Sequence, residues 1–494
     1  MTARATDDVA HLPGTSHPRR QAILVVCCAG LFALVVSLTS LNVALPELQR
    51  ELDATASGLQ WIVDSYAIVF GGLLLTGGAV GDRVGRRAAL MGGFTLFALG
   101  AATGALAGSV TGVIGGRAIA GLGGALLMPA TLATITDVFD ERDAPRAIAI
   151  WAGVAGAGGA FGPAIGGWLI DVWSWRAVFV ANGIIAVVGV LGVLAVVPRL
   201  PGRKERRLDI PGAILSTAAI GALLFAVIEA PGRWTDPWVI GAAVAAVALI
   251  AAFVWHEATT EAPMLPLRVF RSKRRRAGLG TLLFAATGFA GVIFVGALLL
   301  QIGWGESPLA AGLLLLPIGV AELSIAWRAP DLCARFSVSA VVLCGLVLMA
   351  AGYIVMATTP VGDRQMFVVA GIVAGIGNGL TIPPSVDRVI SGAEPELAGV
   401  TAGVEETAIE LGASLGVGIL GGVQRVVLDA RLPEGTPSED VSEAIVAVGS
   451  EVVQPAYVDS ARAALLAAAV AVLAATPWAL GDRRPRRKPS SRTD

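Results

Sequence analysis

Long apolar runs separated by short polar segments dominate the chain. Each run is about 20 residues long, which is the length a helix needs to cross a bilayer. Fourteen such spans are expected, at 22–45, 59–80, 88–108, 111–135, 146–169, 177–197, 210–230, 236–256, 277–301, 308–328, 338–358, 365–386, 398–422 and 461–481. The pattern therefore predicts an all-α polytopic membrane protein.

The polar segments divide these spans into groups of six, two and six. Two basic linkers, near 199–208 and 268–276, bracket the seventh and eighth spans. The expected organisation is a tail at 1–21, a six-helix bundle at 22–197, basic linkers with two extra helices at 198–276, a second six-helix bundle at 277–481 and a tail at 482–494. Two six-helix bundles with a substrate site between them form a transporter architecture.

Composition agrees with this interpretation and excludes other classes. Hydrophobic residues make up 55% of the chain and charged residues 15%, and the mean hydropathy is +0.75. Soluble domains are far more polar. The four cysteines lack metal-ligand spacing, and no nucleotide-binding loop or nucleophile constellation occurs. We therefore expect no enzyme, no metal and no cofactor.

The distribution of arginine and lysine predicts the topology. These residues gather in alternate loops and in the tail at 482–494. Because cytoplasmic loops carry the excess of positive charge, we expect both termini in the cytoplasm. The basic tail is interpreted as a topology anchor that meets anionic lipid, with no nucleic-acid partner. The long outside loop, 427–460, contains "SEDVSEAIVAVGSEVV", which is either a helix over the outer mouth or disordered.

Several acidic residues lie inside the expected spans. They are Asp64, Glu322, Glu405, Glu406 and Glu410. Acids in the bilayer are costly and usually face a water-filled path. A carboxyl group shielded from water favours its protonated form, and once deprotonated it attracts an organic cation. One carboxylate can thus carry a proton and a cation in turn. Alternatively, one or two of these acids pair with polar groups between helices.

Helical spacing separates the three acids of the thirteenth span. Glu406 and Glu410 are four residues apart and share a face, whereas Glu405 points about 100° away from Glu406. We therefore expect Glu406 to be the main exchange acid, with Asp64 its partner across a cavity. Arg117, also embedded, pairs with an acid or with a backbone carbonyl. Further candidates for the cavity wall are Asn42, Trp61, Tyr66, Trp151, Gln301 and Asn378.

Two glycine-containing stretches carry more specific patterns. The first, "GGAVGDRVGRRAAL" at 77–90, places Gly78, Asp82, Arg83, Gly85, Arg86 and Arg87 in one turn between spans. Glycine permits the tight turn, Asp82 can sit at a helix N-terminus, and the arginines can pair with acids. Such a charge latch would hold one of two conformations. A basic topology-setting loop explains the arginines but not the glycine–aspartate spacing.

The second stretch, "GVAGAGGAFGPAIGGWL", lies at 153–169 in the fifth span. Its small residues let helices approach closely, and its proline introduces a kink. The specific positions are Gly158, Gly162, Pro163, Gly166 and Gly167. We expect this helix to pack tightly against its neighbours.

These stretches resemble motifs A and C of the major facilitator superfamily, and "RAIAGLGGALLMPA" at 117–130 is similar to its motif B. With "QWIVDSYAIV", "WSWRAVFVAN" and the "VEE" of the thirteenth span, they resemble the fourteen-span drug:proton antiporters of the QacA and SmvA type. The resemblance covers most of the chain. It implies that the five embedded acids are functional and that Arg117 serves in proton relay. Two departures are Ser37, where those pumps have an aspartate, and the degraded second motif A, "APDLCARFS".

The resemblance implies a proton-coupled antiporter in the plasma membrane of a bacterium. Its expected substrates are lipophilic, cationic drugs or antiseptics, exported by alternating access at the expense of the proton motive force. We expect a monomer whose partners are these cations, protons and the bilayer. Alternatives are an exporter of an endogenous antibiotic or metabolite, a nutrient symporter, against which motif C argues, and a non-transporting receptor or lipid-handling protein.

Overall fold

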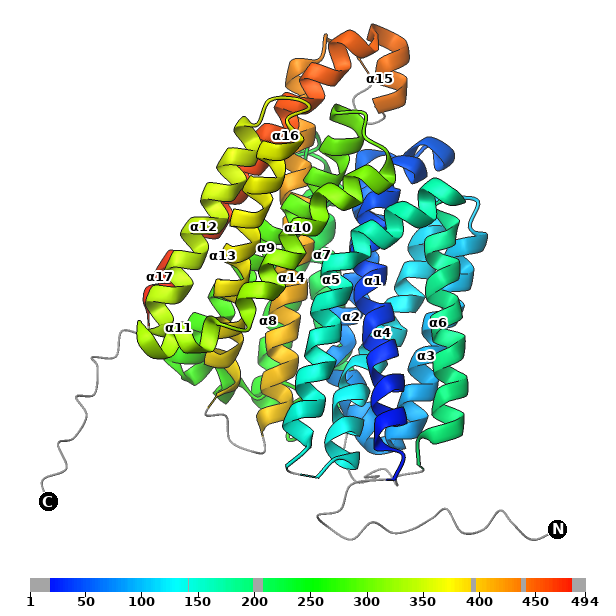
Figure 1. The fold of residues 1–494 in the computed structure, drawn as a ribbon, viewed down its shortest axis with the longest axis vertical. Coiled ribbons are helices and arrows are strands. Elements are labelled where there is room, and N and C mark those ends of the chain that lie inside the picture. The colour runs from blue at the N-terminus through cyan, green and yellow to red at the C-terminus, as the bar shows by residue number, and fades with distance from the viewer. Residues whose placement is uncertain (1–17, 141, 199–207, 392–396, 437–440, 482–494) are drawn as a thin grey trace, which may run out of the picture.

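The computed structural model describes residues 18–140, 142–198, 208–391, 397–436 and 441–481. These residues form helices and no strand (Figure 1). Fourteen of the helices are long and apolar enough to cross a membrane. The prediction of an all-α polytopic chain with fourteen spans is thus confirmed. Most of both expected tails and of the first basic linker lies outside the described residues.

The helices follow the expected order of six, two and six. The N-terminal half contains α1 (Arg20–Leu52), α2 (Ala56–Val84), α3 (Arg86–Leu106), α4 (Val110–Val138), α5 (Ala144–Val172) and α6 (Arg176–Val196). The extra hairpin consists of α7 (Ile210–Glu229) and α8 (Pro237–Thr259), followed by a short 3-10 helix, η1 (Leu267–Arg271). The C-terminal half contains α9 (Lys273–Leu298) with the π-turn η2 (Leu299–Gly303), α10 (Pro308–Ala326), α11 (Ala329–Arg335), α12 (Val338–Thr358), α13 (Arg364–Ile390), α14 (Ala398–Arg431), α15 (Val441–Val448), α16 (Ser450–Leu473) and α17 (Thr476–Leu480).

Local sequence explains where many of these helices begin. Short polar side chains precede the first helical residue and accept a hydrogen bond from a backbone N–H of the first turn. Thr55 caps α2, Ser109 caps α4 and Asp363 caps α13 in this way. The connections between α3 and α4 and between α5 and α6 are short. Helix α3 ends at Leu106 and α4 begins at Val110, while α5 ends at Val172 and α6 begins at Arg176.

The loop expected at 427–460 is largely helical, which corrects its limits. Helix α14 continues to Arg431 and α16 begins at Ser450. Between them, α15 forms the helix that was one of the two alternatives for this segment. Hydropathy detects only the part of a helix that lies in the hydrocarbon, so polar helical ends were assigned to the loop.

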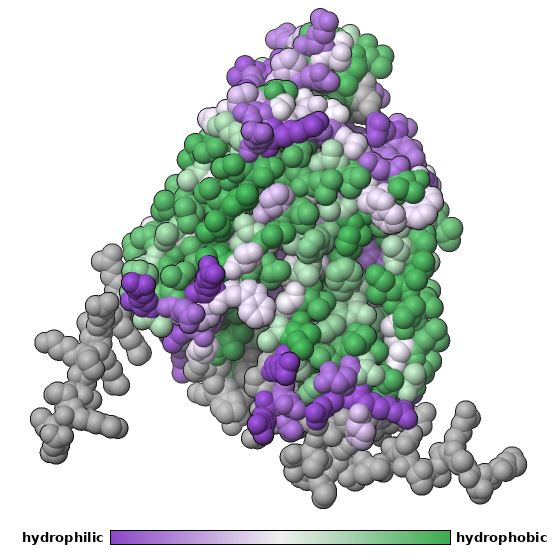
Figure 2. Space-filling model, in the orientation of Figure 1, coloured by the Kyte–Doolittle hydropathy of each residue, from purple (hydrophilic) through white to green (hydrophobic). Residues whose placement is uncertain are grey.

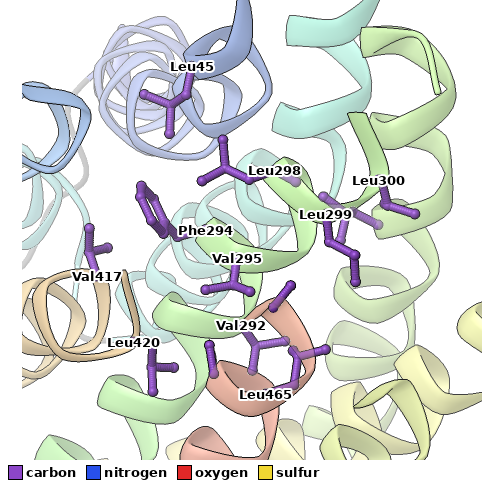
Figure 3. Packing of buried hydrophobic residues seen from close by; sticks show 14 of the residues in the cluster. Leu45, Val292, Phe294, Val295, Leu298, Leu299, Leu300, Val417, Leu420 and Leu465 are labelled. Atoms are coloured by element: carbon purple, nitrogen blue, oxygen red, sulfur yellow. The ribbon is translucent and has the colours of Figure 1, made fainter. Parts of the chain in front are cut away.

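The two halves meet at the end of the bundle that carries α15, here called the α15 end. One hydrophobic cluster crosses between the halves there and joins Leu45 of α1 to Phe294 and Leu298 of α9 and to Val417 of α14. Figure 3 shows these side chains facing one another. Gln301 also donates to the carbonyl of Val43, with 3.1 Å between its Nε2 and that oxygen. The α15 end is therefore closed.

The opposite end, here called the basic end, holds the start of α1 and the α2–α3 turn with Arg83, Arg86 and Arg87. There the fully buried residues of the two halves form separate clusters, although Leu75 of α2 still packs against Gly403 of α14. One cluster consists of residues between Ile23 and Val197 alone, whereas another joins Leu279, Leu282, Val389 and Val404 of the C-terminal half. Figure 2 shows an apolar belt between polar ends and a recess between the halves at the basic end. The bundle thus opens toward the basic end.

The extra hairpin lies on one side of the bundle. Helix α7 packs along α2 and also reaches α14, so it covers the seam between the two halves on that side. Helix α8 packs on α7 and leaves large apolar side chains exposed, including Trp238, Val247 and Trp255. This outer surface is suited to contact with lipid.

Candidate functional site

Arg117 is the buried cation at which α1, α2 and α4 meet. Its Nη1 donates to the hydroxyl of Ser37 at 3.0 Å, and its Nε donates to the carbonyl oxygen of Ile62 at 3.2 Å. The guanidinium also lies over the ring of Tyr66, 4.5 Å from the ring centroid. Of the two expected partners, the backbone carbonyl is present, and no carboxylate is hydrogen-bonded to Arg117 in the described part of the chain.

Close packing of α2 and α4 creates this site. A side chain at Gly121 would meet the backbone of Tyr66, with only 2.6 Å between its Cβ and the carbonyl oxygen. Glycine therefore allows the two backbones to touch. The approach buries the Tyr66 ring completely and leaves Arg117 1% exposed. Burying the guanidinium in the bilayer is costly, so it requires the hydrogen bonds and the π face described above.

Asp64 of α2 is fully buried beside this cation. Ser414 of α14 lies close enough to act on its carboxyl group, but neither carboxyl oxygen makes a well-formed hydrogen bond within the described residues, and the same holds for the hydroxyl of Tyr66 and for Nη2 of Arg117. The charges of Arg117 and Glu410 act on Asp64. Buried polar atoms are normally hydrogen-bonded, so these unpaired groups mark a place that a proton, water or a ligand can occupy.

Helix α14 brings Glu410 to the same place from the C-terminal half. Glu410 is 8% exposed, and its Cβ lies 3.5 Å from the position that a Cβ on Gly71 of α2 would take. One turn away, the hydroxyl of Thr407 donates to the carbonyl oxygen of Gly71 at 3.3 Å. Asp64, Arg117 and Glu410 therefore form one charged group across the seam between the halves.

The other two acids of α14 lie differently. Glu406, half-buried, is one helical turn from Glu410, and their charges interact. Glu405 is buried on the side of α14 that carries Gly412 and Gly416, whose backbones pack against α9. Helical geometry thus directs Glu405 into the C-terminal half and away from α2. The acid packed against α2 is Glu410, whereas Glu406 was expected to partner Asp64.

Glu322 belongs to a separate polar group within the C-terminal half. It lies on α10, and Gly379 of α13 packs against its backbone, with 2.5 Å between a Cβ built on Gly379 and the carbonyl oxygen of Glu322. Its polar neighbours in the described residues are Asn378 and Tyr353. The amide oxygen of Asn378 and the hydroxyl of Tyr353 are buried without hydrogen-bond partners there. The structure does not bring Glu322 into the group around Asp64.

The glycine–arginine turn between α2 and α3 holds its charges within the N-terminal half. Gly85 adopts a φ of +93°, which favours glycine, and ends α2. Arg86 pairs with Asp82 at 2.5 Å and with Asp137 of α4 at 3.1 Å. Arg87 donates to the carbonyl oxygen of Leu194 on α6. At this open end, none of these contacts reaches the C-terminal half.

The glycines of α5 form two tight seams, as the sequence predicts. Gly158, Gly162 and Gly166 face α1, where a side chain would collide with Val35, Thr39 and Ser40, respectively. Gly167 instead faces the start of α10, and Gly312 of α10 packs on the backbone of Pro163. Helix α5 therefore joins the N-terminal half to the C-terminal half without intervening side chains.

The remaining cavity candidates make specific contacts elsewhere. Asn42 donates to the carbonyl oxygen of Leu38, and Gln301 belongs to the closed α15 end. The indole of Trp151 donates to Thr131 of α4, with 3.2 Å between Nε1 and the hydroxyl oxygen. The indole of Trp61 donates to Glu229 of α7 at 3.0 Å. These contacts do not support a cavity-lining role for Trp61, which faces the extra hairpin, or for Gln301.

Sequence reasoning did not identify three of the partners in these contacts. Ser37 was seen as a departure from a pattern, but not as the group that binds Arg117. Asp137 lies at the end of α4 among other acids, and Glu229 lies at the end of α7. Nothing local predicts these three contacts, because the two partners in each are at least 51 positions apart.

Comparison with known proteins agrees with the fold. The family model of the Major Facilitator Superfamily matches residues 26–417. The multidrug efflux pump LfrA of Mycolicibacterium smegmatis is 31% identical over 464 residues, covering 92% of this chain and 91% of that protein. The methyl viologen resistance protein SmvA of Salmonella typhimurium is 31% identical over 440 residues, covering 88% of this chain and 89% of that protein.

A third relative is the tetracenomycin C resistance and export protein of Streptomyces glaucescens, 31% identical over 422 residues, which cover 84% of this chain and 78% of that protein. Among solved structures, a bacterial homologue of the human lysosomal transporter Spinster aligns with a TM-score of 0.68 at 16% identity, covering 94% of this chain and 97% of that one. The fourteen spans among the described residues of this chain, together with its bacterial relatives, indicate a multi-pass protein of the plasma membrane. The chain belongs to the Major Facilitator Superfamily and is a transporter rather than an enzyme.

Proposed function

We propose that the protein is a proton-coupled antiporter that exports lipophilic cations by alternating access. The observation that carries the proposal is Asp64, which is buried at the seam between the halves beside Ser414 and Glu410, with neither carboxyl oxygen in a well-formed hydrogen bond. A carboxylate in that position is strongly driven to take up either a proton or an organic cation. Because it cannot hold both, binding of one releases the other.

The arrangement of charge supports exchange rather than a permanent ion pair. Arg117 donates hydrogen bonds to Ser37 and Ile62 and stacks on Tyr66. It therefore lowers the local negative potential without forming an ion pair with Asp64. The ring of Tyr66 is fully buried, with Arg117 over it and Phe70 stacked 5.5 Å away, so it binds Arg117 rather than substrate. The names of the relatives, a multidrug efflux pump and a methyl viologen resistance protein, favour export of organic cations.

In this proposal the basic end faces the cytoplasm. The arginines of the α2–α3 turn and of η1 lie at that end, where the positive-inside rule places the cytoplasm. The described conformation, closed at the α15 end and open at the basic end, is then the one that receives substrate from inside the cell. Export requires a second conformation in which the α15 end opens and the basic end closes.

Inside-out membrane vesicles test this function. An imposed pH gradient should drive uptake of a cationic dye, a protonophore should abolish it, and ATP alone should not replace the gradient. Asp64→Asn should remove gradient-driven uptake, while the control Glu434→Gln, an exposed acid beyond α14, should leave it intact. Uptake that survives complete collapse of the gradient contradicts the proposal.

The name of the tetracenomycin C resistance and export protein supports a second candidate, export of an antibiotic or metabolite. This candidate includes compounds that carry no positive charge. The same vesicles distinguish the two functions when they are given a panel of neutral polycyclic compounds and matched cations. Transport of the neutral compounds alone, retained in Asp64→Asn, favours the second candidate. Transport of the cations alone favours the first.

A further inference from the structure

Helix α7 and the linker after α8 are held to the N-terminal half by contacts with α2. Three polar contacts join them to α2, one near the α15 end and two about one turn apart in its second half. They are Trp61 Nε1 to Glu229 Oε1 at 3.0 Å, Ser216 Oγ to the carbonyl oxygen of Gly72 at 3.2 Å, and Thr76 Oγ1 to Met264 Sδ at 3.7 Å. Gly72 also brings the backbone of α2 against Thr217.

The contact of α7 with α14, in the C-terminal half, is mainly apolar, although Nη2 of Arg425 on α14 lies 3.9 Å from a Cβ built on Gly232 in the turn after α7. Two glycines of α14 bring its backbone against apolar side chains near the α15 end. A Cβ on Gly418 would lie 3.0 Å from Cγ1 of Val227, and a Cβ on Gly422 would lie 2.8 Å from Cγ of Pro231. Because neither glycine has a side chain, α7 and the turn that follows it pack directly against the backbone of α14.

We propose that the α7–α8 hairpin moves with the N-terminal half and forms part of the gate at the α15 end, with Gly418 and Gly422 as positioning residues that let α14 close against it. This inference rests on the alternating access proposed above. When the α15 end opens, α2 and α14 must separate there, and α7 cannot remain bound to both. We infer that α7 stays bound to α2 and separates from α14 at Gly418 and Gly422.

The energetics favour that choice. Separating α7 from α2 would leave the indole N–H of Trp61 without a partner at the edge of the hydrocarbon, where unpaired polar groups are costly, whereas Glu229 would keep its ion pair with Arg233. Separating Val227 from Gly418 exposes only apolar surface, which lipid tails can cover without a comparable loss.

Just after α8, the packing partners of the chain change from the N-terminal half to the C-terminal half. Leu265 and Phe270 pack on the hydrophobic cluster of the C-terminal half that contains Leu279 and Val389, whereas Met264 contacts α2. The backbone N–H of Leu265 donates to Glu257 at 2.9 Å. The pivot between hairpin and C-terminal half thus lies at residues 264–265, at the basic end.

The first test changes the fit between α14 and the hairpin. Gly422→Ala should disfavour the closed α15 end and lower the efflux rate about tenfold, the shift expected from a typical overpacking penalty. The double variant Gly422→Ala with Pro231→Ala removes the colliding ring atoms and should recover most of the rate. Gly241→Ala on α8, where a Cβ meets nothing within 4 Å, is the matched control. Failure of the double variant to recover, in well-folded protein, overturns the role of Gly422.

The second test uses pairs of cysteines in a variant that lacks the four native ones. Gly418→Cys with Val227→Cys would place the two Cβ atoms 3.9 Å apart, within the range of a disulfide. Gly221→Cys with Ile68→Cys joins α7 to α2, where a Cβ on Gly221 lies 3.8 Å from Cγ2 of Ile68. A short reducible cross-linker at the first pair should abolish efflux, and at the second pair should leave it. The reverse result, or equal effects at both pairs, overturns the proposal.

A third measurement separates this inference from the proposed transport function. Spin labels on α2, α7 and α14 near the α15 end report distances in purified protein without any substrate. As the pH is changed across the range that protonates the buried acids, the α2–α7 distance should stay constant while the α7–α14 distance acquires a second, longer population. A constant α7–α14 distance overturns the inference, whereas loss of dye transport with these distance changes intact counts against the transport function alone.

Discussion

Arg117 of α4 donates a hydrogen bond to the hydroxyl of Ser37 on α1, with 3.0 Å between Nη1 and Oγ. The buried guanidinium is therefore bound by a neutral group. The positive charge of Arg117 remains unneutralised by Ser37 and acts on Asp64 and Glu410. If Asp64 and Glu410 are both ionised, the three groups together carry a net charge of minus one. This relationship links a single position of α1 to the charge of the proposed substrate.

Replacing Ser37 should alter the preference for cation charge. Ser37→Asp places a carboxylate on Arg117 and makes the site one unit more negative, so efflux of dicationic relative to monocationic dyes should increase. Electrostatic complementarity decides such preferences, because a second positive charge is otherwise left uncompensated in a low-dielectric site. The measurement is the ratio of initial efflux rates for matched dyes. Ser37→Asn is the control of similar size, and an unchanged ratio in Ser37→Asp would disprove the link.

Glu410, packed against α2, should be more important for exchange than Glu405. Glu410→Gln removes the acid nearest the seam and should strongly reduce proton release when a cationic dye is added to the solubilised protein. Glu405→Gln acts on the side of α14 toward α9 and should reduce it less. Glu406→Gln, measured in parallel, decides whether Glu406 is the main exchange acid, as the sequence predicted. Equal proton release from wild type and Glu410→Gln would exclude Glu410.

Asp82→Asn should slow transport and leave substrate binding largely unchanged. Asp82 holds Arg86 in the turn between α2 and α3, far along α2 from Asp64. Weakening that pair frees Arg86 and changes the balance between conformations rather than the binding site. The measurement compares the dye Kd with the efflux rate. Asp137→Asn, which removes the second partner of Arg86, is the companion variant. A normal efflux rate in both would rule out a latch in this turn.

Asp209, just before α7, should stabilise the extra hairpin in a pH-dependent manner. Burial raises the pKa of this carboxyl group, but hydrogen bonds from Gly212, His256 and Met264 outweigh it and hold the pKa below its ordinary value. A lowered pKa in the folded state means that the stabilisation is present above the ordinary pKa, near 4, and is lost as the pH falls through the lower folded value.

The corresponding experiment compares thermal unfolding of wild type and Asp209→Asn in detergent. Asparagine can still cap the helix, so the expected cost of about 1 kcal/mol near neutral pH comes from losing the charge that strengthens the hydrogen bonds from His256 and the backbone. The difference between the two proteins should shrink as the pH falls below about 4. Glu434→Gln, which removes an exposed acid, should match wild type throughout. A difference that does not depend on pH would show that the carboxylate charge of Asp209 is not involved.

The sequence by itself determined the architecture and the local motifs. Apolar runs of bilayer length specify helices, because in lipid every backbone N–H and C=O must be satisfied within the segment. The tight turn at Gly85 and the close seams of α5 follow from residues that are adjacent in the chain or repeat along one helix face. The presence of acids within spans was likewise visible, because each stands out against its apolar neighbours.

The tertiary structure decided which of these groups meet. Glu405 and Glu410 occur in the same span, but packing of α14 between α2 and α9 directs them to different halves. Trp61 faces Glu229 rather than a cavity because α7 covers α2, and Arg117 finds Ser37 because α1 crosses α4 at that level. Contacts between helices far apart in sequence depend on the fit of whole surfaces in the folded bundle, and no local pattern encodes that fit.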